Sequence, residues 1–476
     1  MTDAIDILFK NSPGEHVRRE VAVAAFRAAE RDGDVQPQRH VYTDYPISPT
    51  TAKTGGYLTG KGPRVVITGM GVVSPLGLGK NEFCRGVMSG QSGVKRISRF
   101  DPSALPVHVA GEITDFDELA WIDPHERKHV SRVVPLCIAA STEAVADAGL
   151  EPKSMSLAEQ REIGIILGSG GGVQEFSEEQ YRLWHSGQVK QVSLFCIPSG
   201  TMGTLSSEVQ MRFGFRGYSH VITTSCTSST DALGYALQHI QAGAQPMFLA
   251  GGVDTPITPG IIKGYTMLRA LTQSWNHAPE RASRPFSADR DGFVLAEGSW
   301  MFVVEEYEHA RARGAPIYAE IAGYGSTCEA FHRVRLNESG EEPARAITLA
   351  LEEAGLAPED IQYLNLHGTS TPLNDRVETK AVKIALGDHA RKVPMSSLKS
   401  QIGHAQGACG AAGLAATLMA METGELPPTL NIDIPDPDCD LDYVPQPGRH
   451  ASIEHAVCNC VAFGSKNSAI VLRKVA

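Results

Sequence analysis

The strongest constraint on the fold is a unit that recurs along the chain from Arg64 onward. Each unit starts with a short apolar run rich in β-branched residues, passes through a glycine-rich turn and continues into a stretch with helical spacing. In the first part of the chain the runs that predict strands are VVITGM (65–70), EIGIILGSG (162–170) and HVITTSC (220–226). Strand–turn–helix units of this kind predict a layered α/β fold with a largely parallel sheet.

After Gly314 the same pattern begins again, which predicts a duplicated fold. Further strands are expected at PIYAEIAGYGS (316–326), IQYLNLHGTS (361–370) and SAIVLRK (468–474). The predicted helices each end at a glycine, and they lie at 131–149, 228–243, 343–355 and 407–424. We therefore divide this part of the chain into a first half at 61–314 and a second half at 315–476.

Residues 1–60 differ from the two halves. Glu15 to Arg31 has helical periodicity with a charged face, and the residues that follow have the composition of a linker. No basic n-region with an apolar core marks a signal peptide, and several acidic residues disfavour a transit peptide. We interpret the segment as an N-terminal helical extension and linker whose role stays open.

Charge and composition argue against several classes of protein. The formal net charge is −11, which disfavours a nucleic-acid-binding protein because phosphate neutralisation needs an excess of Lys and Arg. No run of 18 or more apolar residues is present, so no membrane span is expected. The nine cysteines are scattered and odd in number, as is typical of reduced thiols rather than a disulfide framework. A cytoplasmic protein is the expectation.

Cys226 is the first candidate for chemistry. It closes an apolar run and opens a predicted helix in TTSCTSSTDALGYAL. Free backbone N–H groups and the positive end of the helix dipole favour a thiolate at such a junction, with an oxyanion site nearby. An isolated buried cysteine is more often an apolar core residue, and the other eight cysteines fit that interpretation.

Two histidines follow strands in the second half. His367 ends a predicted strand before GTSTP, and His404 lies in SLKSQIGHAQGACG before a helix of small residues. A single histidine of this kind is more often structural. The carboxyl ends of parallel strands meet at one crevice, however, so we expect both imidazoles near Cys226. A thiol with two neutral imidazoles can accept an acyl group and then stabilise a thioester enolate.

Three other motifs carry weaker signals. HERKH (125–129) has the histidine spacing of a zinc site but no third ligand, so a solvated charged helix is the better interpretation. GMGVVSPLG (69–77) has Ser and Pro where a dinucleotide loop needs its third glycine and helix. CNC (458–460) has no partner pair and is interpreted as core. No metal site is expected.

From about Arg64 to Val475 the sequence resembles the elongation-type β-ketoacyl-[acyl-carrier-protein] synthases of the thiolase superfamily. The resemblance rests on motifs in a fixed order: VVITGMGVVSPLG, TTSCTSST, SRPFSADRDGFVLAEG, HGTSTPLND, SLKSQIGHAQGACG and PPTLNIDIPDPDCDLDYVP. It implies a thiolase-like duplicated five-layer αβαβα fold. The implied activity is decarboxylative Claisen condensation of an acyl thioester with malonyl-carrier protein in fatty-acid or polyketide biosynthesis.

The resemblance also implies roles for single residues. Cys226 takes the acyl group, while His367 and His404 bind the malonyl thioester oxygen and promote loss of carbon dioxide. Lys399 and Glu378 form a buried ion pair, with Asp375 in the same segment. Phe463 gates the site, and its backbone N–H forms the oxyanion hole together with that of Cys226. The positions for phosphopantetheine are Thr369 and Thr371, and those for carrier-protein docking are Arg127, Lys128 and Arg269.

Partners and cofactors follow from the same resemblance. The expected partner is an acyl carrier protein, which brings the phosphopantetheine, so no cofactor of the chain's own is expected. The family is homodimeric, and a heterodimer with a homologous subunit stays open. Fatty-acid elongation and polyketide extension share this chemistry. A non-catalytic subunit that sets chain length and a zinc hydrolase are the other hypotheses, but such a subunit typically lacks the cysteine.

Several residues depart from the pattern of the family. Ser465 and Lys466 replace Gly and Thr in the C-terminal loop VAFGSKN, and Gly217-Tyr218-Ser219 stands where Gly-Pro-Asn is usual. Arg333 and Arg335 lie near the expected entrance, where we expect them to contact the pantetheine phosphate or carrier-protein acids. Gly171 stands where a bulky aliphatic residue often narrows the acyl pocket. These departures predict a specialised relative with an altered pocket.

Overall fold

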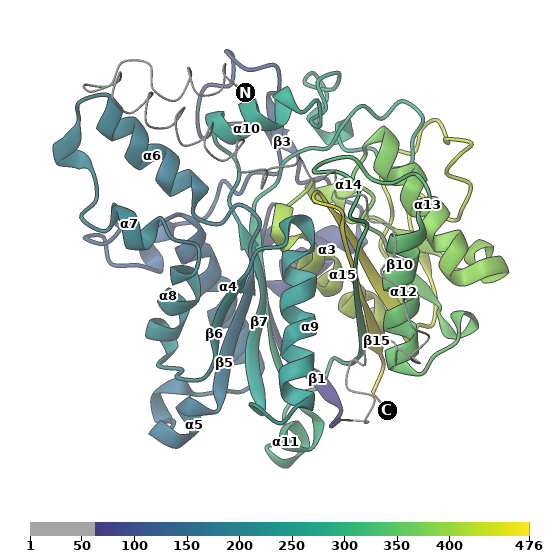
Figure 1. The fold of residues 1–476 in the computed structure, drawn as a ribbon, viewed down its shortest axis with the longest axis horizontal. Helices are drawn as coiled ribbons and strands as arrows, with labels where there is room; N and C mark the ends of the chain where they lie inside the picture. Colours follow the sequence, from purple (N-terminus) through teal and green to yellow (C-terminus); the bar gives the residue numbers. More distant parts are fainter. Residues whose placement is uncertain (1–61, 476) are drawn as a thin grey trace, which may run out of the picture. The chain divides into compact units, whose positions relative to one another are not determined.

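The computed structural model describes residues 62–475 (Figure 1). The helical extension predicted for residues 1–60 lies outside the described residues. Within the described part of the chain, no helix is both long enough and apolar enough to span a membrane.

The first half forms five main strands. They are β1 (Val65–Ser74), β5 (Ile163–Gly168), β6 (Ser219–Ile222), β7 (Met247–Asp254) and β8 (Gly298–Glu306), arranged in space as β6-β5-β7-β8-β1. β5 pairs in parallel with β6 and β7, whereas β8 pairs antiparallel with β7 and β1. In chain order within this half, the strands therefore lie third, second, fourth, fifth, first.

The second half repeats this topology. Its strands are β9 (Ala319–Cys328), β10 (Tyr363–Asn365), β11 (Met395–Ser396), β14 (His455–Ala462) and β15 (Lys466–Arg473), arranged as β11-β10-β14-β15-β9. β10 pairs in parallel with β11 and β14, and β15 pairs antiparallel with β14 and β9. The order third, second, fourth, fifth, first recurs with the same pairing directions. The duplication predicted from the sequence is therefore present in the strand topology.

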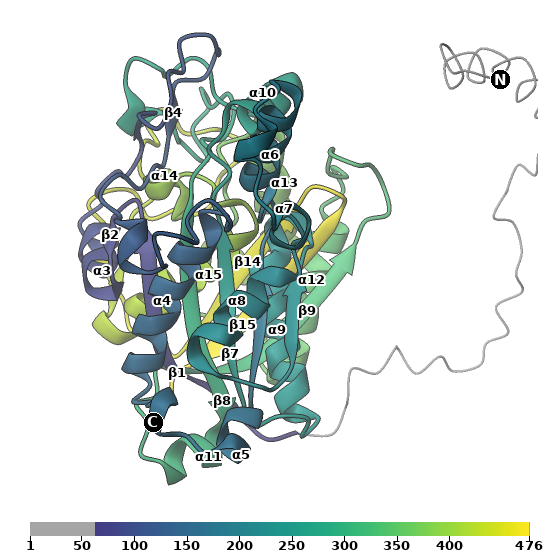
Figure 2. The same cartoon turned by 90° about the vertical axis from the view of Figure 1, so that its left-hand side faces the viewer.

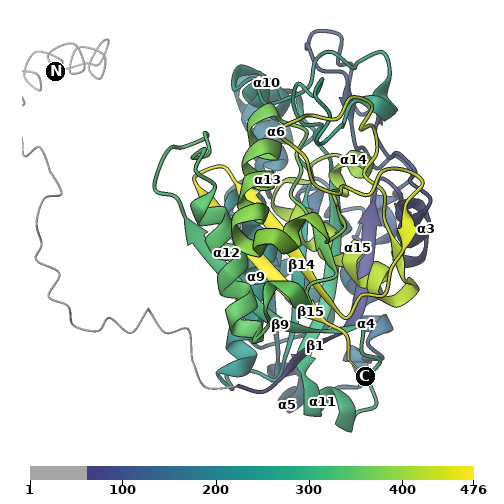
Figure 3. The same cartoon turned by 90° about the vertical axis from the view of Figure 1, so that its right-hand side faces the viewer.

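Helices separate and cover the strands in layers. α9 (Ser228–Gln241) and α15 (Cys409–Thr423) contact each other and strands of both halves, so they form the central layer. α4 (Val133–Asp147) and α8 (Thr204–Phe213) cover the first half, as Figure 2 shows. α12 (Glu341–Ala354) covers the second half with α13 (Pro372–Leu386) beside it (Figure 3). The result is the predicted five-layer αβαβα arrangement.

Small residues allow the central layer to pack closely. α15 is almost entirely buried and contains Gly410 and Gly413. A Cβ atom at Gly410 would lie 2.0 Å from Oγ1 of Thr230 in α9, so only glycine fits there. The same device explains the GMG segment in β1, where Cβ atoms at Gly69 and Gly71 would collide with carbonyl oxygens of α4 at 2.2 and 2.0 Å. These glycines serve helix–strand packing, as expected once the dinucleotide loop is rejected.

The prediction of a largely parallel sheet is wrong. Parallel pairing is confined to β5 and β10 with their neighbours, and the remaining pairings among these ten strands are antiparallel. β14 and β15 are joined by the short turn Phe463–Ser465, and a connection this short permits only antiparallel pairing. The two halves also meet edge to edge through an antiparallel contact of β1 with β9.

The remaining elements lie around this framework. The helices are α3 (Lys80–Met88), α5 (Leu157–Arg161), α6 (Gln174–His185), α7 (Cys196–Ser199), α10 (Pro259–Met267), α11 (Tyr307–Ala312) and α14 (Lys399–Ile402). The short strands are β2 (Gly77–Leu78), β3 (Lys95–Arg96), β4 (Val109–Ala110), β12 (Glu425–Leu426) and β13 (Arg449–His450). Gly314, where we divide the halves, lies between α11 and β9.

Candidate active site

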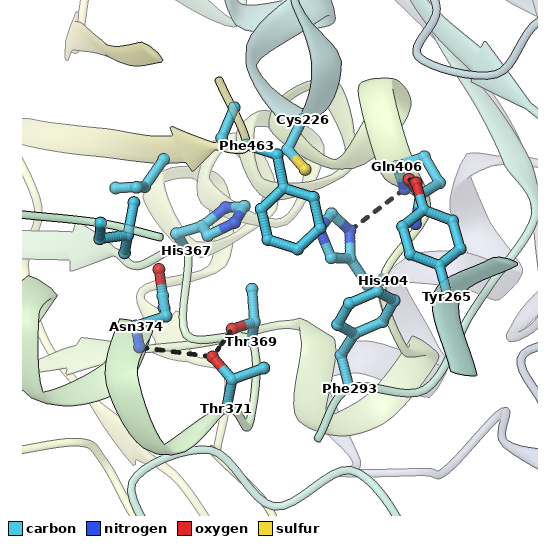
Figure 4. A pocket seen from close by; sticks show the side chains of 13 residues that line it. Cys226, Tyr265, Phe293, His367, Thr369, Thr371, Asn374, His404, Gln406 and Phe463 are labelled. Carbon is cyan, nitrogen blue, oxygen red and sulfur yellow. Dashed lines mark hydrogen bonds between the residues drawn. The ribbon is translucent and has the colours of Figure 1, made fainter. Parts of the chain in front are cut away.

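A cavity at the strand ends is lined by residues of both halves. The empty space there, part of it open to solvent, is about 390 Å³. Figure 4 shows the side chains around it, among them Cys226 and Tyr265 from the first half and His367, Thr369, His404 and Phe463 from the second. The Cys226 sulfur and a ring nitrogen of each histidine lie within 4.8 Å of one another. The structure thus brings together the three residues that the sequence singled out.

Cys226 owes its position to the end of β6. The strand stops at Ile222, Ser225 adopts a left-handed φ of 60°, and Cys226 lies in the turn Ser225–Thr227 that leads directly into α9. Its side chain is buried at the N-terminal end of α9, where free N–H groups and the helix dipole favour negative charge. A non-glycine residue with positive φ costs conformational energy and clusters at functional sites. The local structure therefore suits a nucleophile and a developing oxyanion.

His367 follows β10 and is fully buried. Burial, together with the nearby charge of Lys399, lowers the pKa of His367 to about 3, so the imidazole is neutral at physiological pH. Its Nδ1 lies 3.4 Å from the sulfur of Cys460, and burial raises the pKa of that thiol. The single proton of that thiol is directed to the Cys226 carbonyl at 3.1 Å, so either nitrogen of the neutral ring can carry the ring proton. His367 is then a neutral N–H donor.

His404 is held by the backbone on both sides. Its N–H donates to the Val294 carbonyl at 2.7 Å, and its carbonyl accepts from the Ala296 N–H at 2.9 Å. Its Nδ1 accepts from the backbone N–H of Gln406 at 3.1 Å, so Nδ1 is unprotonated and the proton sits on Nε2. The ring centres of His367 and His404 are 5.2 Å apart, and the ring planes are nearly perpendicular.

The charge state of His404 depends on its neighbours. Burial opposes the charged form, yet the sulfurs of Cys226 and Cys409, when ionised, raise the pKa of His404 to about 9. The Gln406 N–H pointing at Nδ1 opposes that protonation. Acylation of Cys226 removes one of the two anions beside the ring, while the Cys409 sulfur stays in place. The loss of the Cys226 anion and the bond from Gln406 both shift His404 toward the neutral form that a stabiliser of a thioester enolate requires.

The expected ion pair of Lys399 with Glu378 is not formed as a direct contact within 4.0 Å. Glu378 instead accepts from the backbone N–H groups of His367 and Gly368 at 2.6 and 2.7 Å and from Asn459 at 2.7 Å. Burial raises the pKa of Glu378 to about 7, although these donors and the charge of Lys399 oppose the rise. Three short hydrogen bonds satisfy the carboxylate, so it needs no direct cation. Glu378 thereby fixes the loop that carries His367.

A residue that the sequence analysis missed forms the buried ion pair of this region. Arg290, in SRPFSADRDGF, pairs with Asp375 at 3.2 Å, and both side chains are buried. Its guanidinium also donates to the carbonyl oxygens of Thr371 and Pro372 at 3.1 Å each. Arg290 therefore clamps the loop after His367 through three partners. The available signal was that Arg290 stands in one of the motifs named above. Buried arginines are rare unless they are paired, so its burial points to a structural role.

Thr369 and Thr371 both line the cavity. Their hydroxyl oxygens are 2.9 Å apart, and the hydroxyl of Thr371 also caps α13 by accepting from the Asn374 N–H at 3.4 Å. The cap and the hydrogen bond fix both hydroxyls at one side of the site, as Figure 4 shows. This placement is compatible with the predicted contact with phosphopantetheine.

Phe463 projects into the cavity from the turn between β14 and β15. Two residues later, Ser465 adopts a φ of 64°, and its hydroxyl donates to the His332 carbonyl at 2.9 Å. The same oxygen accepts from the His332 N–H at 3.2 Å, and the Gly464 N–H donates to the Arg333 carbonyl at 2.9 Å. Serine at this position thus ties the turn Phe463–Ser465 to the loop at 329–335. A glycine would provide the conformation but not the side-chain hydrogen bonds.

The predicted docking cations fall into two groups. Lys128, Arg269, Arg333 and Arg335 are exposed, whereas Arg127 is half-buried and ion-paired with Glu118. Arg335 lies 3.9 Å from Glu338 at the surface. Exposed cations are available to an acidic partner.

HERKH (125–129) forms turns, so the predicted charged helix is wrong and the helical zinc motif is absent. His129 instead contacts Ser193 at 2.7 Å.

Gly171 lies in the loop after β5. The backbone N–H groups of Gly170, Gly171 and Gly172 and the hydroxyl of Ser169 all donate to the buried carboxylate of Asp254, at 2.8 to 2.9 Å. A Cβ atom at Gly171 would have only ordinary contacts, the nearest at 3.5 Å, so a side chain fits there. Gly171 is not among the residues that line the cavity, and its predicted effect on the acyl pocket stays a prediction.

Two cysteines assigned to the core also belong to the site. The sulfurs of Cys409 and Cys460 lie 3.7 Å apart and contact the Cys226 carbonyl at 3.3 and 3.1 Å. Cys409 is the first residue of α15, and Cys460 lies on β14 two residues after Cys458. The spacing in CNC places both of its cysteines on one face of a strand, which was the available signal. All nine cysteines are free.

Comparison with known proteins places the chain among condensing enzymes. Residues 63–310 match the family model for the N-terminal domain of beta-ketoacyl synthases, and residues 318–433 match that for the C-terminal domain. The 3-oxoacyl-[acyl-carrier-protein] synthase 2 of Synechocystis sp. is 39% identical over 412 residues, which is 86% of this chain and 98% of that protein. The actinorhodin polyketide beta-ketoacyl synthase 1 of Streptomyces coelicolor is 42% identical over 86% of this chain and 88% of its own.

Solved structures agree. The ishigamide ketosynthase/chain length factor has a TM-score of 0.80 at 32% identity, covering 87% of this chain and 100% of that one. A chain in the solved complex of a type II polyketide acyl-carrier protein with its ketosynthase bound to the hexaketide has a TM-score of 0.79 at 33% identity. The coverage of both chains is the same. These matches confirm the predicted thiolase-like fold class and the assignment to an acyltransferase class of enzyme. The chain belongs to the β-ketoacyl synthase family.

Proposed function

We propose that the protein extends an acyl chain by decarboxylative Claisen condensation, with Cys226 as nucleophile and His367 and His404 as the enolate-stabilising pair. The observation that carries the proposal is the convergence of one thiol and two imidazoles within 4.8 Å in a cavity built by both halves. Each group has surroundings that suit its role: a helix N-terminus for the thiol, burial beside Lys399 that keeps His367 neutral, and a backbone N–H that favours the neutral form of His404.

In the first step the Cys226 sulfur attacks the carbonyl carbon of an acyl thioester on the carrier protein. The bond from that carbon to the pantetheine sulfur breaks, and the released thiol leaves with a proton. The backbone N–H groups of Cys226 and Phe463 stabilise the negative charge on the oxygen in the transition state. The acyl group is then held on Cys226 as a thioester.

In the second step a malonyl thioester places its carbonyl oxygen against the Nε2–H groups of His367 and His404. Carbon dioxide leaves, and the electron pair of the broken bond forms the enolate. The enolate carbon attacks the Cys226 thioester, and the thiolate of Cys226 is released. Neutral N–H donors suit this step, because they stabilise the enolate oxygen without first having to lose a proton.

Partners and location follow from the same proposal. An acyl carrier protein delivers both thioesters on its phosphopantetheine arm, with Thr369 and Thr371 as contacts for the arm. The exposed cations Lys128, Arg269, Arg333 and Arg335 then face the carrier protein. No cofactor of the chain's own is needed. A homodimer, or a heterodimer with a homologous subunit, is the proposed assembly, and nine free cysteines support a cytoplasmic location. The chain-length-determining alternative is not favoured, since Cys226 is present.

The test is the mass of the intact protein after incubation with a panel of acyl-carrier thioesters. The expected result is one acyl group on the wild type and none on Cys226→Ala. Cys328→Ala is the matched control, because Cys328 is exposed; it should acylate like the wild type. Full condensation activity in Cys226→Ala would overturn the proposal.

A further inference from the structure

The wall of the cavity contains a polar pair on the side away from the threonines. Figure 4 shows Gln406 and Tyr265 across the Phe463 ring from Thr369 and Thr371. Phe293 packs against Tyr265 with ring centres 5.5 Å apart, so the surroundings of the pair are aromatic. None of the predicted roles includes either residue.

Gln406 has one half of its amide satisfied. The Tyr265 hydroxyl donates to Oε1 of Gln406 at 2.6 Å. Gln406 is only 6% exposed, and its Nε2 atom is buried. This atom has no hydrogen-bond partner among the described residues. A buried donor without a partner is costly, and native proteins seldom contain one without a reason. Tyr265 thus orients the amide of Gln406, a residue that lines the cavity and whose Nε2 is left without a protein partner in the described part of the chain.

The backbone around Gln406 is rigid. Its φ is 50°, a left-handed conformation that is unfavourable for a residue with a side chain. The next residue, Gly407, packs so closely on the loop after β5 that a Cβ atom there would lie 2.2 Å from the Gly170 nitrogen. The N–H of Gln406 also bonds to Nδ1 of His404 at 3.1 Å. The amide is therefore fixed relative to the catalytic imidazole.

We propose that Gln406, positioned by Tyr265, is a specificity-determining residue that donates a hydrogen bond to an oxygen atom on the acyl chain carried by Cys226. The inference rests on the proposed function and names its substrate class: acyl chains that bear a ketone or hydroxyl oxygen, rather than fully saturated chains. The acyl chain is the partner because the threonine pair occupies the side assigned to pantetheine.

Selectivity between acyl chains follows from the free-energy cost of burying Nε2 of Gln406 without a hydrogen-bond acceptor. A saturated chain in the cavity buries Nε2 against methylene groups, while an oxygenated chain accepts its hydrogen bond. A site built to hydrogen-bond its substrate rejects the analogue that lacks the polar group. One neutral hydrogen bond of this kind corresponds to a preference of about tenfold.

The experiment uses the full-length protein and acyl-carrier thioesters of one chain length. One thioester is saturated, and the others carry a single ketone oxygen moved one carbon at a time along the chain. The rate of Cys226 acylation is followed by intact mass. The wild type is expected to prefer one ketone position over the saturated chain by about tenfold. Gln406→Met, which keeps the length of the side chain, is expected to abolish that preference by slowing the ketone chain and accelerating the saturated one.

Two further variants keep the test decisive if Gln406→Met does not fold. Tyr265→Phe removes only the orienting hydroxyl and is expected to reduce the preference several-fold while the saturated chain still loads. Tyr181→Phe is the matched control, since Tyr181 is 64% exposed on α6, and it should keep the full preference.

Each remaining outcome has a meaning. Equal rates for all chains in the wild type, or a preference unchanged in Gln406→Met and Tyr265→Phe, would overturn the inference and leave the condensing activity intact. An equal loss for every chain would assign Gln406 to the pantetheine arm instead and also overturn it. If no chain loads Cys226 in the wild type, the proposed function itself fails.

Discussion

The two halves of the molecule share one strand order and one set of pairing directions, but they differ in what they place at the strand ends. The first half presents a thiol at the start of the central helix α9. The second half presents two imidazoles, one after β10 and one before α15. A duplicated scaffold thus supplies a nucleophile from one copy and hydrogen-bond donors from the other. We infer that the thiol of the first half serves acyl transfer, whereas the imidazoles of the second half serve decarboxylation and condensation.

Each half also uses a buried carboxylate to fix the loop beside its reactive group. Asp254 gathers four donors from Ser169 to Gly172 in the first half. Glu378 gathers the N–H groups of His367 and Gly368 with Asn459 in the second. Among the described residues, neither of these two carboxylates has a cation within 4.0 Å, whereas Asp375 nearby is paired with Arg290. Backbone N–H groups that donate to a carboxylate form charge-assisted hydrogen bonds, which are shorter and stronger than neutral ones.

The largest effect is expected for His404→Ala, which should affect condensation but not acylation of Cys226. His404→Ala removes one of two donors to the enolate oxygen, so condensation should fall by roughly 10²- to 10³-fold. Acyl transfer to Cys226 should persist, because it does not need that donor. Steady-state condensation and intact-mass acylation are measured on the same preparation. Loss of acylation together with condensation in a correctly folded variant would contradict this separation of the two halves.

The next effect concerns the two carboxylates. Glu378→Ala leaves three buried donors unmet and should lower the free energy of unfolding by roughly 3 kcal/mol, with Asp254→Ala costing a similar amount. Glu338→Ala, at an exposed carboxylate, should change it by less than about 0.5 kcal/mol. Chemical denaturation checks all three. An effect of Glu378→Ala as small as that of Glu338→Ala would show that Glu378 does not anchor the loop.

A pH dependence of stability should follow from His367. The unfolded chain takes up a proton near pH 6.5, whereas burial keeps the folded pKa near 3. Stability should therefore fall as the pH drops from 6.5 toward 3, by up to about 1.4 kcal/mol per pH unit. His367→Asn lacks this proton uptake and should show a shallower slope in thermal or denaturant unfolding. Equal slopes would contradict a neutral, buried His367.

The smallest effect is expected at the turn Phe463–Ser465. Ser465→Gly removes both side-chain hydrogen bonds to His332 but relieves a positive φ, so the net change in stability should stay within about 1 kcal/mol. Amide exchange at 329–335 should nevertheless become faster, because the loop loses its tie to the turn. Unchanged exchange there would show that Ser465 does not restrain the loop.

The strand and helix pattern could be predicted because periodicity and glycine stops are local signals. The strands expected at 65–70 and 162–170 appear as β1 and β5, and the helix expected at 228–243 appears as α9. The direction of pairing could not be predicted, because an apolar run is compatible with parallel or antiparallel neighbours. HERKH was interpreted as a helix for the same reason: local charge spacing does not record the turns that tertiary contacts impose.

Within the site, the residues with distinctive chemistry could be predicted and their partners could not. Cys226, His367 and His404 stand at junctions that the sequence marks. Arg290 donates to a carbonyl oxygen that is distant in sequence. Gln406 contacts the distant Tyr265, and it reaches the His404 imidazole through an unusual φ. The pairing of Glu378 with backbone N–H groups was also hidden, since backbone donors leave no trace in the sequence. Such partners emerge only once the loops are folded.

The most direct test of the division between halves is to measure both partial reactions on Cys226→Ala and His404→Ala. Release of carbon dioxide from malonyl-carrier protein reports the second half, and acylation seen by intact mass reports the first. We expect that Cys226→Ala still decarboxylates but is not acylated, whereas His404→Ala is acylated but barely decarboxylates. Loss of both partial reactions in both correctly folded variants would contradict it.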